Sequence, residues 1–286
     1  GTSKVHSVLK DNAGNLWIAI YQKGVMMIPA QPNSFKYIGY KSINKNIIGS
    51  NCITSLCRDH KGILWIGTDN DGIYGITTEL KQKVHYAPHD SPSSVPSTVF
   101  GLYEDSEHNL WFGSYTNGLG RLDKKTGQCS YLQNLTDKHG NRIQRVYDLV
   151  EDQDKRLWIA TMGAGLFYYD LKTGQSVYDP KFNAATEKYK WISCLLYAGD
   201  NHLYVGTYDG IRCIDLSTDD FKTEEILSRH IIHSLYEDPQ GNIWIGNSEG
   251  LAEWNPQTQQ LKTYTTAHGL SSNAVYAIKG DGQDNL

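Results

Sequence analysis

The stretch Asp59-His-Lys-Gly-Ile-Leu-Trp-Ile-Gly-Thr68 decides the fold, because close copies of it recur along the whole chain. At its centre an aromatic residue stands between two apolar residues, and a small residue follows the second apolar residue. This pattern occurs six times, on Trp17, Trp65, Trp111, Trp158, Tyr204 and Trp244. The intervals between these aromatic residues are 48, 46, 47, 46 and 40 residues, so the chain is built from one repeated unit.

Each repeat contains four short apolar runs separated by turn residues. An apolar residue stands twelve positions before each central aromatic residue, and a glycine followed by an apolar residue lies six or seven positions after it. No run has the length or the 3.6-residue period of a substantial helix, so each repeat predicts a four-stranded antiparallel sheet. Sheets repeated at this interval are typical of a β-propeller, in which they pack around an axis as blades.

The predicted fold is therefore an all-β propeller formed by the single domain 1–286, most simply seven-bladed with an incomplete last blade. Six full repeats span approximately residues 5–50, 51–96, 97–143, 144–189, 190–229 and 230–272. Residues 273–286 supply one further strand, the first of a seventh blade, led by Val275 and Ile278. The closure of the ring is left open by this unfinished blade.

Turn residues recur at fixed places in the repeat. Six positions before the aromatic residue every full copy carries an aspartate except the fifth, which has Ala198. An aspartate that opens a tight turn accepts a hydrogen bond from its own backbone two residues on. Residues that tolerate a positive φ stand three positions before the aromatic residue in four copies: Gly14, Gly62, Asn201 and Gly241. His108 and Lys155 take that position in the other two, so we expect those turns to be strained or differently shaped.

The repeated aromatic residues recur in step with the strands, so we interpret them as packing wedges between blades rather than as platforms for sugars. The first strand of each blade is expected to lie innermost, since its third residue is small in most copies. Asp148 is the exception at this position. We expect it to hold a water or a cation in the axial channel, or to pair with a nearby arginine.

Composition and motifs exclude several classes of function. The chain carries 27 Lys and Arg against 31 Asp and Glu, a net charge of -4, without a sustained basic run, so no nucleic-acid partner is expected. No apolar run approaches the length of a membrane helix. The five cysteines lack zinc-site spacing, and His230 and His233 would point to opposite faces of a strand, so no metal and no other cofactor is predicted. Known catalytic motifs are absent, so we predict no catalytic residue and no enzyme activity for this stretch.

Residues that break the repeat mark a candidate binding face, which carries the loops between second and third strands and the loops between repeats. Aromatic rings beside amides, carboxylates and cations suit sugars, and the arginines also suit sulfate or carboxylate groups. The candidates are Trp191, Arg145, Arg142, Tyr115, Asn117, Tyr208, Asp209, Tyr21, Lys23, Arg229 and His230. Trp191 is the foremost candidate because it immediately precedes an innermost strand, near the mouth of the channel. The alternatives are that Trp191 plugs the channel and that the others are solvated loop residues.

Three stretches carry a resemblance to a known family. The run from Asp59 to Thr68 with Asp71-Gly72-Ile73, the run from Asp238 to Gly246, and the linker from His268 to Tyr276 resemble the two-component regulator propeller repeat. The resemblance covers essentially the whole chain. It implies the periplasmic sensor region of a Bacteroides-type hybrid two-component system regulator, in which two propellers precede a β-sandwich, a membrane helix and a histidine kinase.

The resemblance also implies a function and partners. Such a sensor detects oligosaccharides released from a complex glycan and regulates transcription of the genes for its use. The implied partners are an oligosaccharide ligand, the adjacent propeller and β-sandwich, and a second copy of the parent protein in a homodimer. The implied location is periplasmic, within an inner-membrane protein.

Two other functions stay open. One is a propeller lyase of the streptogramin-inactivating type, which uses a similar ring with a metal and a histidine on one face and would depend on His230. The other is a scaffold without a ligand that mediates dimerisation of the sensor.

Overall fold

The structure is a computed structural model that describes residues 5–20, 24–28, 30, 38, 48–50, 52–77, 83–137, 139–178, 183, 187–218, 221–281 and 285–286. The chain divides into two compact units, Gly1–Gly49 and Ser50–Leu286, which are described separately. The assignment of the whole chain to one domain stays a prediction. Among the described residues, no helix has the length and apolar character needed to cross a membrane.

The second unit holds five four-stranded antiparallel sheets, each an uninterrupted series of four consecutive strands, which we call blades. Their strands are β4 (Ile53–Arg58), β5 (Ile63–Thr68), β6 (Ile73–Thr77) and β7 (Lys83–Tyr86); β8 (Val99–Glu104), β9 (Leu110–Ser114), β10 (Leu119–Leu122) and β11 (Cys129–Tyr131); β12 (Val146–Glu151), β13 (Arg156–Thr161), β14 (Leu166–Asp170) and β15 (Gln175–Val177); β16 (Ile192–Tyr197), β17 (His202–Thr207), β18 (Gly210–Asp215) and β19 (Thr223–Ser228); and β20 (Ile232–Glu237), β21 (Ile243–Asn247), β22 (Gly250–Asn255) and β23 (Gln260–Tyr264). Two 3-10 turns, Glu187–Lys190 and Thr266–His268, are the helical elements of the described chain.

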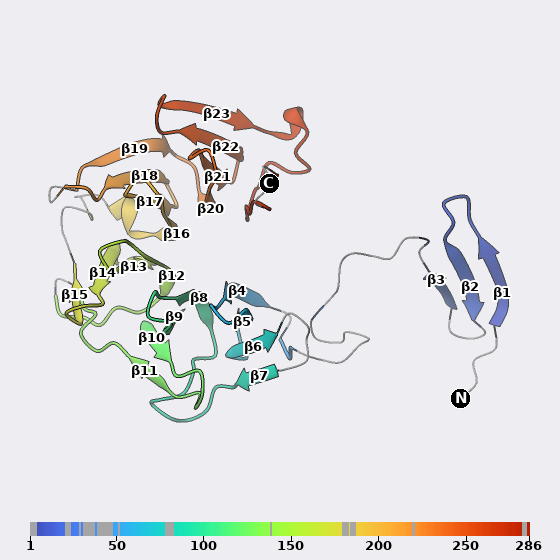
Figure 1. The fold of residues 1–286 in the computed structure, drawn as a ribbon, viewed down its shortest axis with the longest axis horizontal. Coiled ribbons are helices and arrows are strands. Elements are labelled where there is room, and N and C mark those ends of the chain that lie inside the picture. Colours follow the sequence, from blue (N-terminus) through green and yellow to red (C-terminus); the bar gives the residue numbers. More distant parts are fainter. Residues whose placement is uncertain are drawn as a thin grey trace. The chain divides into compact units, whose positions relative to one another are not determined.

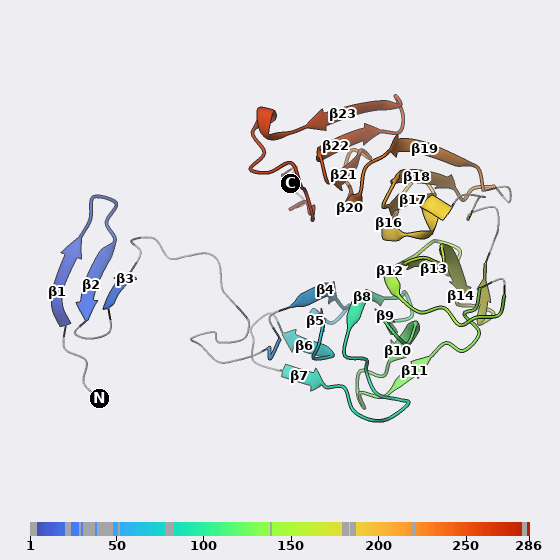
Figure 2. The same ribbon diagram turned by 180° about the vertical axis from the view of Figure 1, so that it is seen from behind.

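The blades follow one another in chain order around a common centre, and the first strand of each lies innermost (Figure 1). The view from behind shows the same order (Figure 2). Consecutive first strands contact each other directly from β4 to β20. The all-β propeller architecture with four-stranded antiparallel blades is therefore confirmed, while the count of seven blades stays a prediction.

The first unit holds an antiparallel sheet of three strands, β1 (Val5–Lys10), β2 (Leu16–Ile20) and β3 (Gly24–Ile28). The fourth apolar run of this repeat, near Phe35 and Tyr37, lies outside the described residues. Many apolar side chains of the sheet are exposed, namely Val5, Val8, Leu9, Leu16, Trp17, Val25, Met26, Met27 and Ile28, whereas those of residues 18–20 are half-buried. Within this unit the sheet keeps its hydrogen-bonded ladder, and the unit's own described residues cover little of its faces.

The strand predicted for residues 273–286 is not found within residues 273–281 and 285–286. A strand needs a paired neighbour, and no described segment forms a ladder with this part of the chain. Two local features of the repeat are nevertheless present. The Val275 amide donates to the Asn247 carbonyl at 3.0 Å, and the Asp281 amide donates to the Asn285 carbonyl at 3.1 Å, which closes the repeat's first turn.

The repeated aspartates form the predicted turns and one further bond. In the second repeat Asp59 Oδ1 accepts the Lys61 amide at 3.0 Å, two residues on, as expected. Its Oδ2 accepts the Trp65 indole Nε1–H at 2.9 Å, a bond that the sequence analysis did not predict. The same bond to the indole six residues on is made by Asp11, Asp105, Asp152 and Asp238. The fifth repeat has lost both partners, since Ala198 and Tyr204 stand in their places.

The turn position predicted to favour a positive φ is left-handed whatever residue occupies it. Gly62 has φ 79°, and Asn201 has φ 64°. His108 and Lys155 have φ 67° and 70°, so their turns share the shape of the glycine turns. A left-handed backbone is unfavourable for a residue with a Cβ, so of the two expected outcomes strain is the one found.

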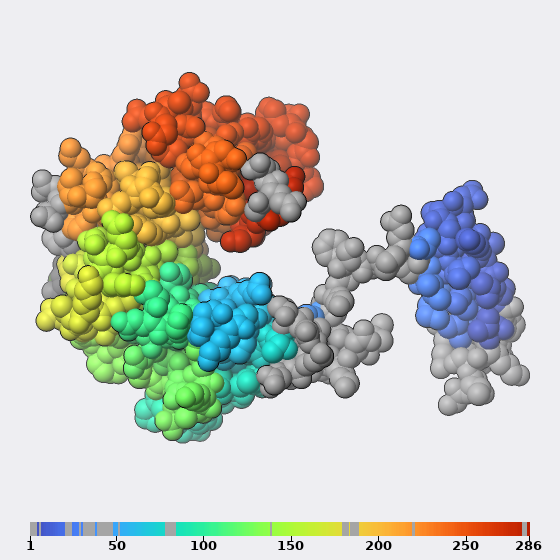
Figure 3. All heavy atoms as spheres, viewed as in Figure 1, coloured from blue at the N-terminus to red at the C-terminus, as the bar shows by residue number. Residues whose placement is uncertain are grey.

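Four of the repeated aromatic residues lie in the cores between consecutive blades. Trp65, Trp111, Trp158 and Tyr204 are buried, and each packs against apolar residues of the following blade. Trp158, for example, lies with Leu195, Leu203 and Ile214. The space-filling view shows the blades of this unit in direct contact (Figure 3). Trp244, on the last blade, is half-buried, and Trp17 in the first unit is 40% exposed.

Candidate functional site

The loops of the candidate face are joined across blades by backbone hydrogen bonds. The Arg145 amide, before β12, donates to the Tyr115 carbonyl in the β9–β10 loop at 3.2 Å. The Tyr208 amide, in the β17–β18 loop, donates to the carbonyl of Trp191 at 3.1 Å. The loop between β13 and β14 connects the two pairs, because the Met162 amide donates to the Arg145 carbonyl at 3.0 Å and Met162 forms a β-bridge with Trp191. Residues from three blades are thus held on one surface.

Arg145 and Tyr115 form one half of this surface. The guanidinium carbon of Arg145 lies 5.2 Å from the centre of the Tyr115 ring, within cation–π distance. Tyr115 is 42% exposed, and Arg145 is exposed as well. The Arg145 backbone is left-handed, with φ 50°, and is held there between the Tyr115 carbonyl and the Met162 amide. The backbones that carry the cation and the ring are therefore tied together across two blades.

Trp191 and Tyr208 form the other half. Their rings are stacked, with centres 6.1 Å apart and planes 30° apart, and they are 40% and 43% exposed. The indole lies beside Gly163, which has φ 101°. Its stacking on Tyr208 leaves Trp191 as part of an exposed aromatic pair. We call the four residues Tyr115, Arg145, Trp191 and Tyr208 the aromatic rim.

Two further aromatic residues support the rim from below. Phe100 on β8 contacts Tyr115 edge to face, with ring centres 5.9 Å apart, and contacts Tyr147 on β12 at 4.8 Å. Burial raises the pKa of Tyr147, and the neighbouring Tyr208 phenol adds to the rise. Both residues stand second in an innermost strand, where other repeats have Thr54 and Ser193. Neither residue was among the predicted candidates, although an aromatic residue at a position that holds Thr54 or Ser193 in other repeats is a signal visible in the sequence.

The other candidates lie in neighbouring loops. An Arg142 guanidinium nitrogen donates to the Asn117 carbonyl at 3.1 Å, so these two candidates are paired with each other. The Arg229 amide donates to the carbonyl of Asp209, next to Tyr208 in sequence, at 3.1 Å. Tyr21 and Lys23 lie outside the described residues.

His230 points to a different loop. Its Nε2 lies 3.3 Å from a carboxylate oxygen of Glu249, and its Nδ1 lies 2.6 Å from the Ser228 carbonyl. His233 instead packs on Tyr276, with ring centres 4.6 Å apart. The structure therefore places the two histidines in separate surroundings.

Asp148, on the innermost strand β12, is bound by backbone amides rather than by an arginine. Its Oδ1 accepts the Leu149 amide at 2.9 Å, and its Oδ2 accepts the Leu195 amide of the next blade at 2.8 Å. Burial raises the pKa of the Asp148 carboxyl to about 6, against the lowering effect of these two bonds. The predicted arginine partner is not found among the residues that the structure describes, and the carboxyl instead ties two blades together.

Four segments of the chain, residues 47–70, 93–116, 142–163 and 226–249, match the family model of the two component regulator propeller. No curated protein sequence matches the chain.

Among solved structures, the extracellular domain of a one component system from B. thetaiotaomicron is similar, with 22% identity and a TM-score of 0.67 over 90% of this chain and 36% of that one. The extracellular domain of a hybrid two component system from the same organism shares 18% identity, with a TM-score of 0.52 over 95% of this chain and 41% of that one. Virginiamycin B lyase from Staphylococcus aureus shares 14% identity, with a TM-score of 0.59 over 94% of this chain and 86% of that one.

The chain thus spans well under half the length of the two Bacteroides domains that it resembles. At these identities the three structures establish the fold. The chain is thus a β-propeller, and four of its segments match the family model of the two component regulator propeller.

Proposed function

We propose that the chain is a ligand-sensing propeller from the periplasmic part of a hybrid two-component system regulator, and that its aromatic rim binds an oligosaccharide released from a complex glycan. The regulator repeats and the fold shared with Bacteroides extracellular domains support the sensor role. The rim itself carries the ligand proposal, because three aromatic rings, each about two-fifths exposed, lie on bonded loops of three blades, and an arginine contacts one of these rings.

The chemistry of the rim suits a sugar. Trp191 and Tyr208 offer ring faces on which the C–H face of a pyranose can stack. Tyr115 and Tyr208 carry hydroxyl groups that donate and accept hydrogen bonds, and the Arg145 guanidinium suits a carboxylate or sulfate on the sugar. Exposed aromatic groups gathered on one face are typical of an interaction site. The preferred ligand is therefore an oligosaccharide with at least one acidic group.

In this proposal the propeller recognises the ligand and other parts of the parent protein transmit the signal. The adjacent propeller, the β-sandwich and a second copy of the parent would respond to the bound oligosaccharide. The histidine kinase would then change the transcription of glycan-utilisation genes. This chain itself turns over no substrate.

Isothermal titration of the complete sensor region against neutral, uronic and sulfated oligosaccharides tests the proposal. We expect saturable binding to one acidic class, and at least a tenfold loss of affinity in Trp191→Ala and in Arg145→Ala. Lys172→Ala, an exposed change in the β14–β15 turn, is the matched control and should bind as the wild type does. Absence of binding to every glycan by the complete region would refute the proposal.

A lyase is the second candidate function, because virginiamycin B lyase is similar over nearly the whole of both chains. Its test is turnover of quinupristin in the presence of magnesium, with loss of turnover in His230→Ala. Turnover that depends on His230 would replace the sensor proposal. A scaffold function is the third candidate, and it predicts that the complete region forms a dimer without binding any glycan.

A further inference from the structure

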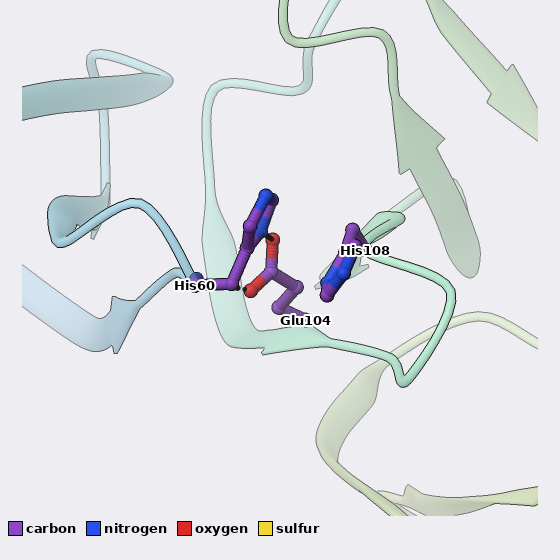
Figure 4. Close-up of side chains that lie close together, drawn as sticks. All are labelled: His60, Glu104 and His108. Atoms are coloured by element: carbon purple, nitrogen blue, oxygen red, sulfur yellow. Dashed lines mark hydrogen bonds and ion pairs between the residues drawn. The ribbon is translucent and has the colours of Figure 1, made fainter.

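A second cluster of chemically active side chains lies at the opposite end of the blades from the rim. The rim loops precede the innermost strands, whereas His60 and His108 occupy the turns that follow β4 and β8. Glu104 is the last residue of β8. Figure 4 shows His60, from the turn of one blade, beside the carboxylate of Glu104 and the ring of His108 from the next blade.

The three side chains are within reach of a single ion. Glu104 Oε1 lies 2.8 Å from His60 Nδ1, and the rings of His60 and His108 are stacked with centres 3.7 Å apart. One ligand atom from each residue lies within 4.8 Å of the other two. Two imidazole nitrogens and a carboxylate oxygen are a donor set that Zn²⁺, Ni²⁺ and Cu²⁺ favour.

The carboxylate is held by a bond that leaves one of its oxygens for other partners. Glu104 Oε2 accepts the backbone amide of His60 at 2.6 Å. We call this bond, from a carboxylate at the end of an innermost strand to a backbone amide of the preceding blade, the clamp. The same clamp joins the next pair of blades, where Glu151 Oε2 accepts the Ser106 amide at 2.7 Å. In both pairs Oε1 is the oxygen that meets the variable side chains. The bond from Oε2 to the backbone amide is therefore common to both pairs of blades. The two pairs differ in the side chains around Oε1.

The blades β8–β11 and β12–β15 show which side chains lie around the carboxylate oxygen Oε1 when no histidine is present. There Glu151 Oε1 accepts the Ser106 hydroxyl at 2.5 Å and lies 3.3 Å from the Lys155 ammonium. Ser106 and Lys155 stand at the repeat positions of His60 and His108. In that pair a hydroxyl and an ammonium lie at Oε1. In the first pair Oε1 lies beside the His60 imidazole, on which the His108 ring stacks, and beside the ammonium of Lys124.

One ammonium group competes for the carboxylate. Lys124 Nζ lies 2.6 Å from Glu104 Oε1 and 3.7 Å from Asp59 Oδ2. An ion on Oε1 would repel this ammonium, and Asp59 offers it a carboxylate close by. The charge of Lys124 can thus be retained without its bond to Glu104.

We propose that His60, Glu104 and His108 bind one divalent transition-metal ion of the Zn²⁺ class between the β4–β7 and β8–β11 blades. The clamp from Glu104 to the His60 amide presents Oε1 beside the His60 ring, and rotation of the His108 ring completes the set. The ion joins two blades at the same place where Ser106 meets Glu151 and Lys155 between the next two. Its binding stabilises the folded chain, because the assembled ligand set exists only in the folded state.

Titration calorimetry of the metal-stripped full chain with Zn²⁺ alone tests the site. We expect one saturable site and a melting temperature that rises with zinc concentration. The double variant His60→Ser with His108→Lys copies the Ser106–Glu151–Lys155 set, so it should melt at the wild-type temperature without metal and bind zinc at least tenfold more weakly. His108→Asn provides a second variant, since Asn201 adopts the same left-handed turn with φ 64°. His139→Ser, which changes an exposed histidine elsewhere, should bind zinc as the wild type does.

Two results would overturn the proposal. One is the absence of zinc binding by the wild type. The other is wild-type stoichiometry and affinity in both the double variant and His108→Asn, which would assign the bound zinc to other groups. Glycan binding at the rim does not enter this test.

Discussion

The second unit and the first unit show the same repeat in two settings, as four-stranded blades packed on one another and as one three-stranded sheet described by itself. Asp59 and Asp11 both bond the indole six residues on, at 2.9 Å and 2.8 Å. Yet Trp65 is 2% exposed, whereas Trp17 is 40% exposed. The turn chemistry is local and forms in either unit, while burial requires an adjacent blade. The repeat therefore specifies the shape of a blade, and the stability of the propeller comes from the cores between blades.

Removing the central aromatic residue should have the largest effect on the unfolding free energy, and this effect should differ between the two units. Trp158→Ala empties a fully buried site between two blades and is expected to cost about 3–5 kcal/mol of unfolding free energy. Trp17→Ala removes an exposed ring and is expected to cost no more than about 0.5 kcal/mol. Urea unfolding followed by circular dichroism measures both. Equal losses would mean that the β1–β3 sheet is packed against a neighbour in solution.

Removing the turn aspartate should have the next largest effect. Asp152 accepts the indole of Trp158 and the Nε–H of Arg156 in a buried setting, so Asp152→Ala leaves those donors unpaired and should cost about 3 kcal/mol. Asp11→Ala removes an equivalent but exposed set, so it should cost clearly less than Asp152→Ala. Thermal unfolding gives both values. A loss in Asp11→Ala as large as that in Asp152→Ala would show that burial does not set the strength of this bond.

The buried carboxyl of Asp148 predicts a pH dependence of the unfolding free energy. The small residues at the same position of the other repeats have no group that could titrate in this way. The pKa of Asp148 is raised to about 6 in the folded state, so the native chain holds a proton that the unfolded chain releases near pH 4. Stability should fall as the pH rises from 4 to 6. Because part of the residue's surface is accessible, the expected change is about 1–2 kcal/mol rather than the full value of the shift.

Asp148→Asn provides the control for that titration. The difference in stability between the wild type and this variant should change in favour of the variant between pH 4 and 6, and should level off above pH 7. A difference that stays constant across this range in urea titrations would show that Asp148 has an ordinary pKa.

The fifth repeat offers the smallest and most specific test. Installing the missing pair with Ala198→Asp and Tyr204→Trp should restore the bond between carboxylate and indole. Each single change adds an unpaired group to a buried site, so the double variant should be more stable than the sum of the single changes by about 1 kcal/mol. Additive effects in the double-mutant cycle would show that the pair is not coupled.

The strands and turns could be predicted from the sequence because they depend on residues within one repeat. The spacing of Trp65 and its counterparts located the strands, and Asn201 among the glycines of the first turn marked its left-handed position. The candidates Tyr115, Arg145, Trp191 and Tyr208 were predicted as members of one face, and in the structure backbone hydrogen bonds between blades hold their loops together.

The histidine cluster and the residues that support the rim could not be predicted because they depend on contacts between repeats. Glu104 meets His60 across 44 residues, and no spacing rule for a metal site joins positions in two different turns. The support from Phe100 and Tyr147 was missed because large residues on an innermost strand look like ordinary core. The predicted strand near Val275 lacks a described partner to pair with, so it could not form a ladder.

Hydrogen–deuterium exchange of the complete sensor region, with and without a saturating acidic oligosaccharide, tests the central claim most directly. The proposed function predicts slower exchange at the rim amides of Arg145, Met162 and Tyr208, and no change in the turns of His60 and His108 at the other end of the blades. Protection confined to another part of the molecule, or no protection with any oligosaccharide, would contradict the assignment of the rim as the sensing site.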